Sequence, residues 1–263
     1  TITLYKQIIT KFATIIGDLD IKAVQPYHVE LYKARRINEV SPMKVNIDFR
    51  MLKAAFNRAV KFKIIDSNPF LECRNIVVPE KEPYALSKED TNRLLEEIKD
   101  ERMKAIITLG ILTMMRAGEI VNLKWEDIDF EKRFIHLKNR ENFTLKGKRR
   151  RSIPLNIAAV AILHRLKNES SYVFDREVAL KDPVAAISRR FKRYVRKAGL
   201  CEDIHFHSLR HTGATWLIQK EVPIAYIQKI LGHANITTTL IYTRRDDDYL
   251  KEAIDRFDSI ILN

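Results

Sequence analysis

The sequence predicts a mainly α-helical protein that also contains a small antiparallel β-sheet. Apolar residues recur at helical spacing through most of the 263 residues, which is typical of helices that bury one face. Three short stretches, residues 128–130, 134–137 and 151–155, instead alternate like strands and are separated by polar turns. Strands this short and this close in sequence predict one antiparallel sheet inside an otherwise helical chain.

A proline-containing stretch indicates that the chain folds as two domains. Residues 74–86 carry two prolines and show no helical period, as linkers between domains do. The expected division is a helical domain over residues 1–76, a linker over residues 77–86 and a larger domain over residues 87–263. At this length the chain has room for two domains that each bury an apolar core.

The first domain is predicted to be a compact group of helices. The run TLYKQIITKFATIIG repeats apolar residues with a period near 3.6, Pro26 marks a second helix start, and Ser41 with Pro42 opens a long third helix. Asn68 and Pro69 are expected to end that pattern. The polar positions carry many basic residues, namely Lys33, Arg35, Arg36, Lys44, Arg50, Lys53, Arg58 and Lys61. We expect this basic face to contact nucleic-acid phosphates, with a merely solvated surface as the alternative.

The second domain is predicted to start with a capped helix and then to alternate helices with the strands. Ser87 and Asp90 have the spacing of a helix cap in SKEDTNRLLEEIK, and a buried helix is expected over residues 103–115. After the strands, helical spacing resumes over residues 157–167 and 184–200. The last of these is the most basic helix of the chain, with Arg189, Arg190, Lys192, Arg193 and Arg196. It is expected to lie along a groove or the backbone of a nucleic acid.

The charge balance favours a nucleic-acid partner and argues against a membrane. Basic residues outnumber acidic ones to give a formal net charge of +13, and no single basic tail accounts for it. No apolar run reaches the roughly 18 residues that a membrane span needs.

The two cysteines, Cys73 and Cys201, are far apart in sequence, so a reducing, cytoplasmic setting without disulfides is expected. The chain opens on Thr1 with no signal peptide, so we expect a fragment or a processed chain.

The stretch HFHSLRHTGATWLIQKEVPIAYIQKILGHANITTTLIYTRR carries residue types that indicate covalent chemistry. His207 and Arg210 stand three apart and would share a helix face, which Ser208 could cap. His233 follows a predicted helical run, and Tyr242 comes nine residues later. A phenol is almost wholly protonated near neutral pH, so it needs an electrophile whose charge is neutralised. Arginines and histidines around a DNA phosphodiester supply that neutralisation, and Tyr242 would attack the phosphorus.

Two further cations would complete such a site. Arg116 ends an apolar run in which an unpaired charge would be costly, and Glu119, three residues on, could hold its guanidinium. Lys146 lies in TLKGKRRRSIPL between two strand-like runs, so its side chain would sit on a hairpin turn and could reach a leaving oxygen. The alternatives to Lys146 are its neighbours Lys148, Arg149, Arg150 and Arg151.

Each of these assignments has another interpretation. Arg116 could act only as a salt-bridge partner of Glu119. A zinc site is conceivable because His207 and His211 stand one helical turn apart, and its ligands would be Cys201, His205, His207 and His211. That interpretation leaves the arginine and the tyrosine unexplained, so we expect no metal. His211 and Trp216 are expected to be packing residues, and Tyr249 is the alternative nucleophile.

The motifs occur in the order found in a known family. MRAGEIVNLKWEDID resembles the first arginine box of the tyrosine recombinases, the phage-integrase-like enzymes, and KGKRRRSIPL resembles their lysine-bearing β-hairpin. HSLRHTGATWL resembles the His-x-x-Arg box, and LGHANITTTLIYT resembles the closing His-to-Tyr box. The resemblance covers essentially the whole chain. It implies a core-binding domain that clamps DNA together with the catalytic domain, and the catalytic residues Arg116, Lys146, His207, Arg210, His233 and the nucleophile Tyr242.

The resemblance also implies an activity and partners. A site-specific recombinase or integrase would cleave DNA through a 3′-phosphotyrosyl intermediate and rejoin it without ATP, metal or another cofactor, integrating or excising a mobile element. The segment after Tyr242 has apolar residues at helical spacing. It would dock on a neighbouring protomer in a tetramer on double-stranded DNA, or else in cis. Directionality and DNA-bending proteins are partners expected on family grounds. The alternatives are Xer-like dimer resolution, a type IB topoisomerase-like activity and a non-catalytic DNA-binding relative.

Overall fold

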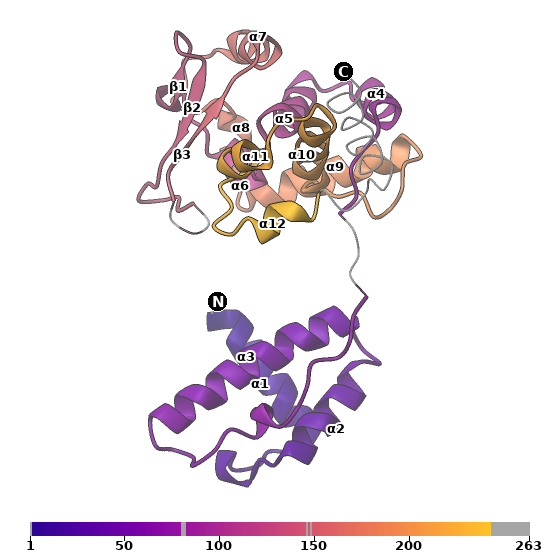
Figure 1. The fold of residues 1–263 in the computed structure, drawn as a ribbon, viewed down its shortest axis with the longest axis vertical. Coiled ribbons are helices and arrows are strands. Elements are labelled where there is room, and N and C mark those ends of the chain that lie inside the picture. The colour runs from indigo at the N-terminus through magenta and orange to yellow at the C-terminus, as the bar shows by residue number, and fades with distance from the viewer. Residues whose placement is uncertain (1, 80–82, 146, 148, 243–263) are drawn as a thin grey trace, which may run out of the picture. The chain divides into compact units, whose positions relative to one another are not determined.

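The computed structural model describes residues 2–79, 83–145, 147 and 149–242. Helices make up most of it, and one small three-stranded sheet has the strand order β1-β2-β3 with both pairs antiparallel (Figure 1). The predicted fold class, mainly α with a small antiparallel sheet, is therefore confirmed. The chain divides into two compact units, residues 1–81 and residues 82–263.

The first unit is a helical bundle around a cluster of aromatic rings. Its elements are α1 (Ile2–Ile16), the 3-10 helix η1 (Ile21–Ala23), α2 (Pro26–Arg36), α3 (Pro42–Lys61) and the 3-10 helix η2 (Pro69–Leu71). The ring of Phe12 on α1 lies 5.2 Å from that of Tyr32 on α2 and 5.7 Å from that of Phe70 on η2, measured between centroids. The ring of Phe56 on α3 lies 4.9 Å from Phe70. Aromatic contacts at these distances add to the burial of apolar surface, so they join all three long helices.

The third helix starts as predicted but ends earlier. The Ser41 hydroxyl accepts a hydrogen bond from the Lys44 amide, which caps α3 at the predicted position. The helix stops at Lys61 rather than continuing to Asn68, because Lys63 adopts a left-handed conformation with φ 57°. The amide of Ile64 then bonds back to the Ala59 carbonyl, as in a Schellman C-cap.

The second unit contains the sheet and most of the helices. Its elements are α4 (Lys88–Glu96), α5 (Glu101–Thr113), α6 (Ala117–Val121), the 3-10 helix η3 (Trp125–Asp127), β1 (Ile128–Asp129), β2 (Phe134–Leu137), β3 (Arg151–Pro154), α7 (Ile157–Leu166), α8 (Asp175–Val178), α9 (Pro183–Lys197), α10 (Ser208–Gln219), α11 (Ile224–Leu231) and α12 (Thr237–Leu240). Figure 1 shows the sheet along one side of this unit, with α5 and α10 adjacent to each other at its centre. In the sheet, Ile135 faces Ile153 across β2 and β3, and both are fully buried.

Helices α5 and α10 approach so closely that their backbones nearly touch. A Cβ atom added to Gly213 on α10 would lie 2.2 Å from the Ile111 carbonyl oxygen and 2.7 Å from a side-chain carbon of Met114. Only glycine fits at such a distance. A small apolar cluster of Met114, Ala214, Ile227, Leu231 and Tyr242 also joins α10 to α11 and to the segment that carries the tyrosine.

Several element boundaries differ from the sequence predictions. The buried helix α5 begins at Glu101, where Asp100 accepts hydrogen bonds from the amides of Arg102 and Met103, and it ends before Met114, whose φ is 52°. The predicted strand at residues 128–130 is only two residues long. Ser208 does not cap α10, because its hydroxyl lies 2.8 Å from the Nδ1 atom of His205 and 3.2 Å from the His205 amide.

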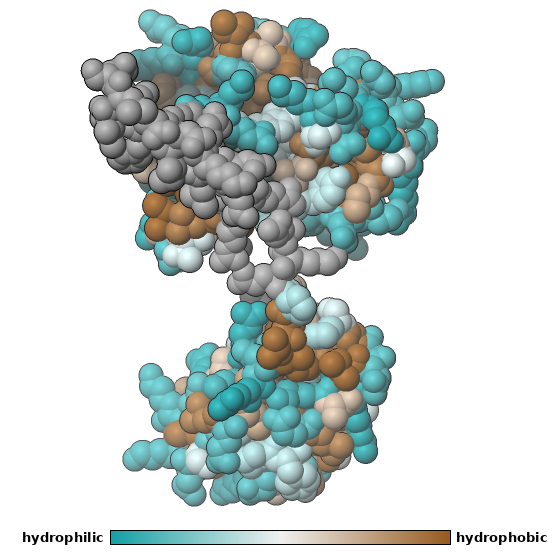
Figure 2. Space-filling model, turned by 45° about the vertical axis from the view of Figure 1, so that its right-hand side comes forward, coloured by the Kyte–Doolittle hydropathy of each residue, from teal (hydrophilic) through white to brown (hydrophobic). Residues whose placement is uncertain are grey.

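The surface of the described residues is largely polar. Figure 2 shows hydrophilic side chains over most of the visible face of both units, with separate apolar patches between them. Within the part of the chain that the structure describes, no helix has both the length and the apolar character needed to cross a membrane.

Candidate active site

Arg116 stands at the turn between α5 and α6. Because Met114 adopts a left-handed conformation, the chain leaves α5 and Arg116 becomes the N-cap residue of α6. Its amide donates to Glu119 Oε2 at 2.7 Å, and its guanidinium NH1 donates to Glu119 Oε1 at 3.0 Å. The expected contact between Arg116 and Glu119 is thus present, and the Arg116 side chain remains about one-fifth exposed. The guanidinium is held in place while one side of it stays open.

Arg210 is the most deeply buried cation of this region. It lies in the first turn of α10 and is 1% exposed. Its NH1 donates to the Met114 carbonyl at 2.7 Å, and its NH2 donates to the Leu231 carbonyl at 2.5 Å. Its Nε has no hydrogen-bond partner among the described residues, and none of the ion pairs found within that part of the chain involves Arg210. A buried guanidinium without a carboxylate has a positive charge that an anion could neutralise.

Three histidines surround the two arginines. His207 precedes α10, and its ring lies 4.8 Å from that of His211 one turn later, measured between centroids at an angle of 89°. His233 follows Gly232, which ends α11 in a left-handed conformation, as glycine commonly does. The Nδ1 atom of His233 lies 3.0 Å from the Thr239 hydroxyl, which fixes the orientation of its ring.

Tyr242 follows α12 and is almost fully buried. Its side chain is 6% exposed and packs with Met114 and Ala214. Its hydroxyl lies 2.8 Å from the Nδ1 atom of His211. Burial raises the pKa of Tyr242, while the charges of Arg210 and Arg116 act in the opposite direction. The phenol is therefore protonated at neutral pH and lies within the field of both arginines.

The cations depress the basicity of one another and of the histidines. Burial, followed by the charges of Arg116 and Arg151, lowers the pKa of Arg210 to about 9. Burial, followed by the neighbouring histidines, lowers the pKa of His211 to about 3. Burial and then Arg210 lower the pKa of His233 to about 4. Both of these rings are therefore neutral at pH 7, so each has one nitrogen that donates and one that accepts.

Sequence reasoning missed two residues of this cluster, Arg151 and His211. Arg151 appeared only as an alternative to Lys146, yet it is 7% exposed and forms a double hydrogen bond with Glu119 at 2.7 and 2.8 Å. Its position on β3 two residues before the buried Ile153 was the available signal, because residues two apart on a strand share a face. His211 was expected to be a packing residue, and its spacing of one turn from His207 was the signal that placed both on one face.

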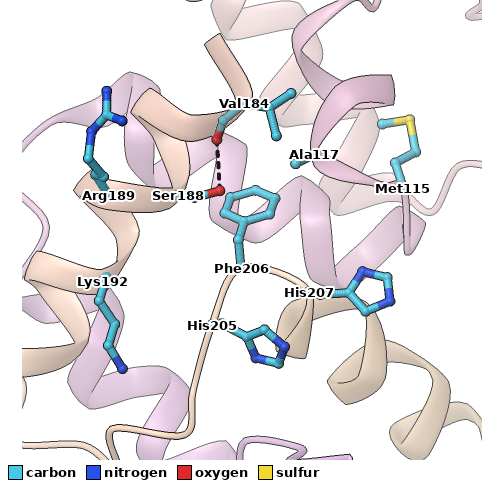
Figure 3. Close-up of a pocket in the computed structure, with 9 residues that line it drawn as sticks. All are labelled: Met115, Ala117, Val184, Ser188, Arg189, Lys192, His205, Phe206 and His207. Atoms are coloured by element: carbon cyan, nitrogen blue, oxygen red, sulfur yellow. Dashed lines mark hydrogen bonds between the residues drawn. The ribbon is translucent and has the colours of Figure 1, made fainter. Parts of the chain in front are cut away.

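A pocket of about 520 Å³ opens beside His207 (Figure 3). Figure 3 shows Arg189 and Lys192 of α9 along one side of this pocket and His205 and His207 on the other. The amine of Lys192 is occupied by the carbonyl of Ile204 and the carboxylate of Glu202, whereas Arg189 is exposed. The remaining lining residues are Met115, Ala117, Val184, Ser188 and Phe206. The hollow next to His207 is thus mainly apolar, with the exposed guanidinium of Arg189 at one side.

Lys146 lies outside the residues that the structure describes, and so does Tyr249. The neighbouring residues 139–145 and 149–150 carry no regular strand, and the hairpin enters β3 at Arg151. Within the described residues, no group of three or more His, Cys, Asp or Glu side chains is arranged to hold a metal ion. The suggested zinc ligands His205 and His211 instead bond to Ser208 and Tyr242.

The basic residues predicted to contact DNA differ in whether their charged groups are paired within the protein or exposed to solvent. Lys33 is buried rather than exposed, and it binds the Arg74 carbonyl and Glu30, both at 2.7 Å. Other side chains of this set engage neighbouring acidic or backbone groups: Arg35 with the Ile15 carbonyl, Arg36 and Lys44 with the buried Asp48, and Arg190 with Asp100 and Glu177. Lys53 lies over the ring of Phe49. Besides Arg35, the exposed residues of this set are Arg50, Arg58, Lys61, Arg189, Arg193 and Arg196, of which Arg196 pairs with Glu202.

Known proteins resemble this chain in sequence and in fold. The sequence profile of the Phage integrase family matches residues 85–248. The chain is 33% identical over 230 residues to tyrosine recombinase XerA of Pyrococcus furiosus, which covers 84% of this chain and 76% of that relative. It is 29% identical over 255 residues to a tyrosine recombinase of Pseudothermotoga lettingae, covering 92% of this chain and 85% of that relative.

Solved structures share the fold over most of the chain. The Tn1549 transposon integrase in complex with transposon right end DNA superposes with a TM-score of 0.75 at 23% identity, covering 95% of this chain and 92% of that one. A lambda integrase tetramer bound to a Holliday junction superposes with a TM-score of 0.74 at 20% identity, covering 89% of this chain and 71% of that one.

Proposed function

The chain belongs to the phage integrase family and is a tyrosine recombinase, an enzyme that breaks and rejoins DNA, and we propose that it is an integrase whose nucleophile is Tyr242. The observation that carries this assignment is the state of Arg210. A guanidinium that is 1% exposed, next to Arg116 and without a carboxylate of its own, suits an anion that arrives from outside. A DNA phosphodiester is such an anion, and Tyr242 lies within the field of the same two arginines.

In the proposed reaction the Tyr242 oxygen attacks the phosphorus of a phosphodiester. A 3′-phosphotyrosyl bond forms as the bond to the 5′ oxygen breaks, and that oxygen leaves as a hydroxyl. Arg116 and Arg210 hold the nonbridging oxygens, because the fork of a guanidinium matches phosphate geometry. Attack by a 5′ hydroxyl of the partner strand then reverses the step. Because the phosphotyrosyl bond conserves the energy of the broken linkage, the reaction needs neither ATP nor metal.

Proton transfers fall to the remaining groups. Lys146 would protonate the departing 5′ oxygen, and His207 and His233 would donate hydrogen bonds to the phosphate or accept a proton. The neutral ring of His211 lies next to the phenol, with its Nδ1 atom 2.8 Å from the hydroxyl, and would accept the phenolic proton in the tautomer that leaves Nδ1 unprotonated. Tyr242 is buried in this arrangement, so its hydroxyl must exchange the bond with His211 for contact with the phosphate.

Covalent trapping on nicked suicide duplexes tests the proposal. Wild-type protein with chelated metal is expected to form a protein–DNA adduct on a pool of candidate recombination sites, and Tyr242→Phe is expected to form none. Tyr249→Phe is the matched control and should retain the adduct. An adduct that persists in Tyr242→Phe but is lost in Tyr249→Phe would identify Tyr249 as the nucleophile instead. Sequencing the trapped DNA identifies the site, and site-dependent joining of two duplexes distinguishes recombination from topoisomerase-like relaxation.

We also propose that the enzyme works as a tetramer on DNA and that the segment after Tyr242 links its protomers. The lambda integrase structure that this fold resembles is a tetramer on a Holliday junction, which supports the proposal. Deleting residues 246–263 is expected to weaken cooperative DNA binding and strand exchange. Unchanged cooperativity would favour docking of the tail in cis.

Two uses of the reaction are open to such an enzyme, namely movement of a mobile element and resolution of chromosome dimers. The names of the curated relatives favour an Xer-like role, whereas the solved transposon integrase favours element movement. We propose element integration or excision. Recovery of element ends, rather than one chromosomal site, from the trapped DNA supports that choice.

A further inference from the structure

Arg151 occupies a central place in the site although the reaction scheme gives it no part. It is the first residue of β3, and only 7% of its side chain is exposed. Its NH1 and NH2 donate to the two carboxylate oxygens of Glu119 at 2.8 and 2.7 Å, and its Nε donates to the Ile230 carbonyl at 2.9 Å. Three donors of one guanidinium therefore join the sheet to α6 and to the end of α11.

Glu119 is saturated by this arrangement. Its Oε1 accepts from the guanidinium groups of both Arg116 and Arg151, and its Oε2 accepts from the Arg116 amide and from Arg151. Each carboxylate oxygen has two lone pairs, so all four acceptor positions are used. Although burial acts to raise the pKa of Glu119, the hydrogen bonds and charge of Arg151 and then those of Arg116 lower it overall. The carboxylate stays ionised and cannot rotate without losing two bonds at once.

The contact with α11 reaches the other half of the site. The Ile230 carbonyl that binds Arg151 is adjacent to the Leu231 carbonyl that binds Arg210. Gly232 follows, and a Cβ atom there would lie 2.7 Å from the Arg151 Cδ atom, so the turn packs directly on the Arg151 side chain. His233 comes next. One side chain thus sets the positions of the carbonyl groups and the turn that hold Arg210 and His233.

The charges give Arg151 a second effect on Arg116. Glu119 is the one carboxylate that contacts Arg116 among the described residues. If Arg151 were absent, the full charge of Glu119 would neutralise Arg116 and weaken its attraction for a phosphate. Because Arg151 also binds this carboxylate, through two hydrogen bonds, the carboxylate neutralises Arg116 only in part, and Arg116 still attracts a phosphate.

We infer that Arg151 is a positioning residue for DNA strand cleavage, one that orients Arg116, Arg210 and His233 without contacting the phosphate; this inference rests on the proposed function. A lysine cannot reproduce the contacts, because a single amine cannot span both oxygens of Glu119 and the Ile230 carbonyl. Both charge and fork geometry are needed at this position.

Single-turnover adduct formation on the suicide duplex measures the effect. Arg151→Met is expected to lower the cleavage rate about 100-fold, the loss expected when a reacting group is misplaced by about 1 Å, while DNA affinity by gel shift changes less than about threefold. Arg151→Lys keeps the charge and should remain at least about 10-fold impaired. Arg133→Met removes an equal charge from the exposed β1–β2 turn of the same sheet and should cleave normally. Wild-type cleavage by Arg151→Met, or full recovery in Arg151→Lys, would overturn the inference.

A neutral substrate separates positioning from a general loss of structure. A methylphosphonate at the scissile linkage removes the negative charge that Arg116 and Arg210 neutralise. The rate ratio of wild type to Arg151→Met should therefore shrink to about 10 or less on this substrate, because electrostatic stabilisation no longer dominates. A ratio that stays near 100 would show that Arg151 does not act through the arginines.

Hydrogen exchange of the free protein distinguishes failure of the inference from failure of the proposed function. In Arg151→Met, amides of residues 230–236 are expected to exchange faster, while those of residues 105–111 in α5 stay protected. If wild type forms no adduct on any substrate, the proposed function fails, and the exchange data still decide whether Arg151 holds the turn. Unchanged exchange at residues 230–236 would refute that role.

Discussion

Replacing Arg210 with methionine should remove catalysis while leaving the free protein about as stable as before. Methionine matches the length of the arginine stem and fits the apolar surroundings that Met114 and Leu231 provide. The charged group that it removes is unfavourable in the absence of DNA, because it is buried beside two further guanidinium groups and has no carboxylate partner in the described structure.

The expected stability follows from two opposing effects. The pKa of Arg210 is lowered to about 9, and since each pKa unit corresponds to about 1.4 kcal/mol, removing the charge contributes about 4 to 5 kcal/mol in favour of the variant. The carbonyls of Met114 and Leu231 lose their donors, and each buried acceptor left unpaired costs about 1 to 3 kcal/mol. The two effects largely cancel, so the variant should lie between about 2 kcal/mol less stable and about 3 kcal/mol more stable than wild type.

Urea denaturation measures this change, and Arg102→Met provides the contrast. Arg102 pairs with Asp175 and the buried Glu177, so its removal should cost about 3 kcal/mol, because Glu177 then keeps only the longer contact with Arg190 at 3.4 Å. Single-turnover cleavage by Arg210→Met should fall about 100- to 1,000-fold, the loss typical for one donor to a developing oxyanion. Sulfate should stabilise wild type more than Arg210→Met. A loss of stability well above that of Arg102→Met, or cleavage near the wild-type rate, would refute this reasoning.

Three further changes have clear expected outcomes. The Lys146→Ala variant should not cleave an ordinary duplex. It should cleave a 5′-bridging phosphorothiolate near the wild-type rate, because a thiolate leaves without a proton. Loss of cleavage on both substrates would exclude Lys146 as the acid. Gly213→Ala should destabilise the protein by about 3 kcal/mol or more in urea denaturation, since its Cβ would meet the Ile111 carbonyl at 2.2 Å. Gly118→Ala, with its closest contact at 3.5 Å, should leave stability unchanged or raise it by up to about 1 kcal/mol, because alanine is favoured over glycine within a helix; equal effects would contradict the packing described. The free energy of unfolding should fall as the pH drops from about 6.5 toward 4. In this range histidines of the unfolded chain take up protons, whereas in the folded protein burial keeps the pKa of His211 near 3 and that of His233 near 4. His211→Phe should flatten this dependence and the exposed His136→Phe should not; identical pH profiles for the two variants would be inconsistent with a neutral His211.

Local sequence signals were sufficient where chemistry and backbone agree. Ser41 and Ser87 cap the helices that were predicted to follow them, and Gly232 ends α11 in the left-handed conformation that glycine favours. The boxes around Arg116 and Arg210 could be found because each places its charge beside an apolar run, where an unpaired charge is energetically costly. Those two residues do share one electrostatic environment with His233 and Tyr242.

The contacts that the sequence did not predict all depend on tertiary structure. Arg151 and Glu119 are 32 residues apart, and only the register of β2 with β3 turns Arg151 inward toward α6. Tyr242 and His211 are 31 residues apart and meet because α12 returns the chain to α10. The early end of α3 at Lys61 was missed for a different reason, since apolar spacing continues into a segment whose backbone has already left the helix at Lys63.

The contact of Gly213 with the backbone of α5 makes the two central helices a fixed spacer. Arg116 follows one of these helices and Arg210 belongs to the other, so main-chain contact sets the separation of the two backbone segments from which the guanidiniums extend. Exposed residues of α9, such as Arg193, lie outside this contact, so substitutions there leave the separation of the two helices unchanged. An engineer who alters the outer surface of this domain can therefore leave the spacer untouched.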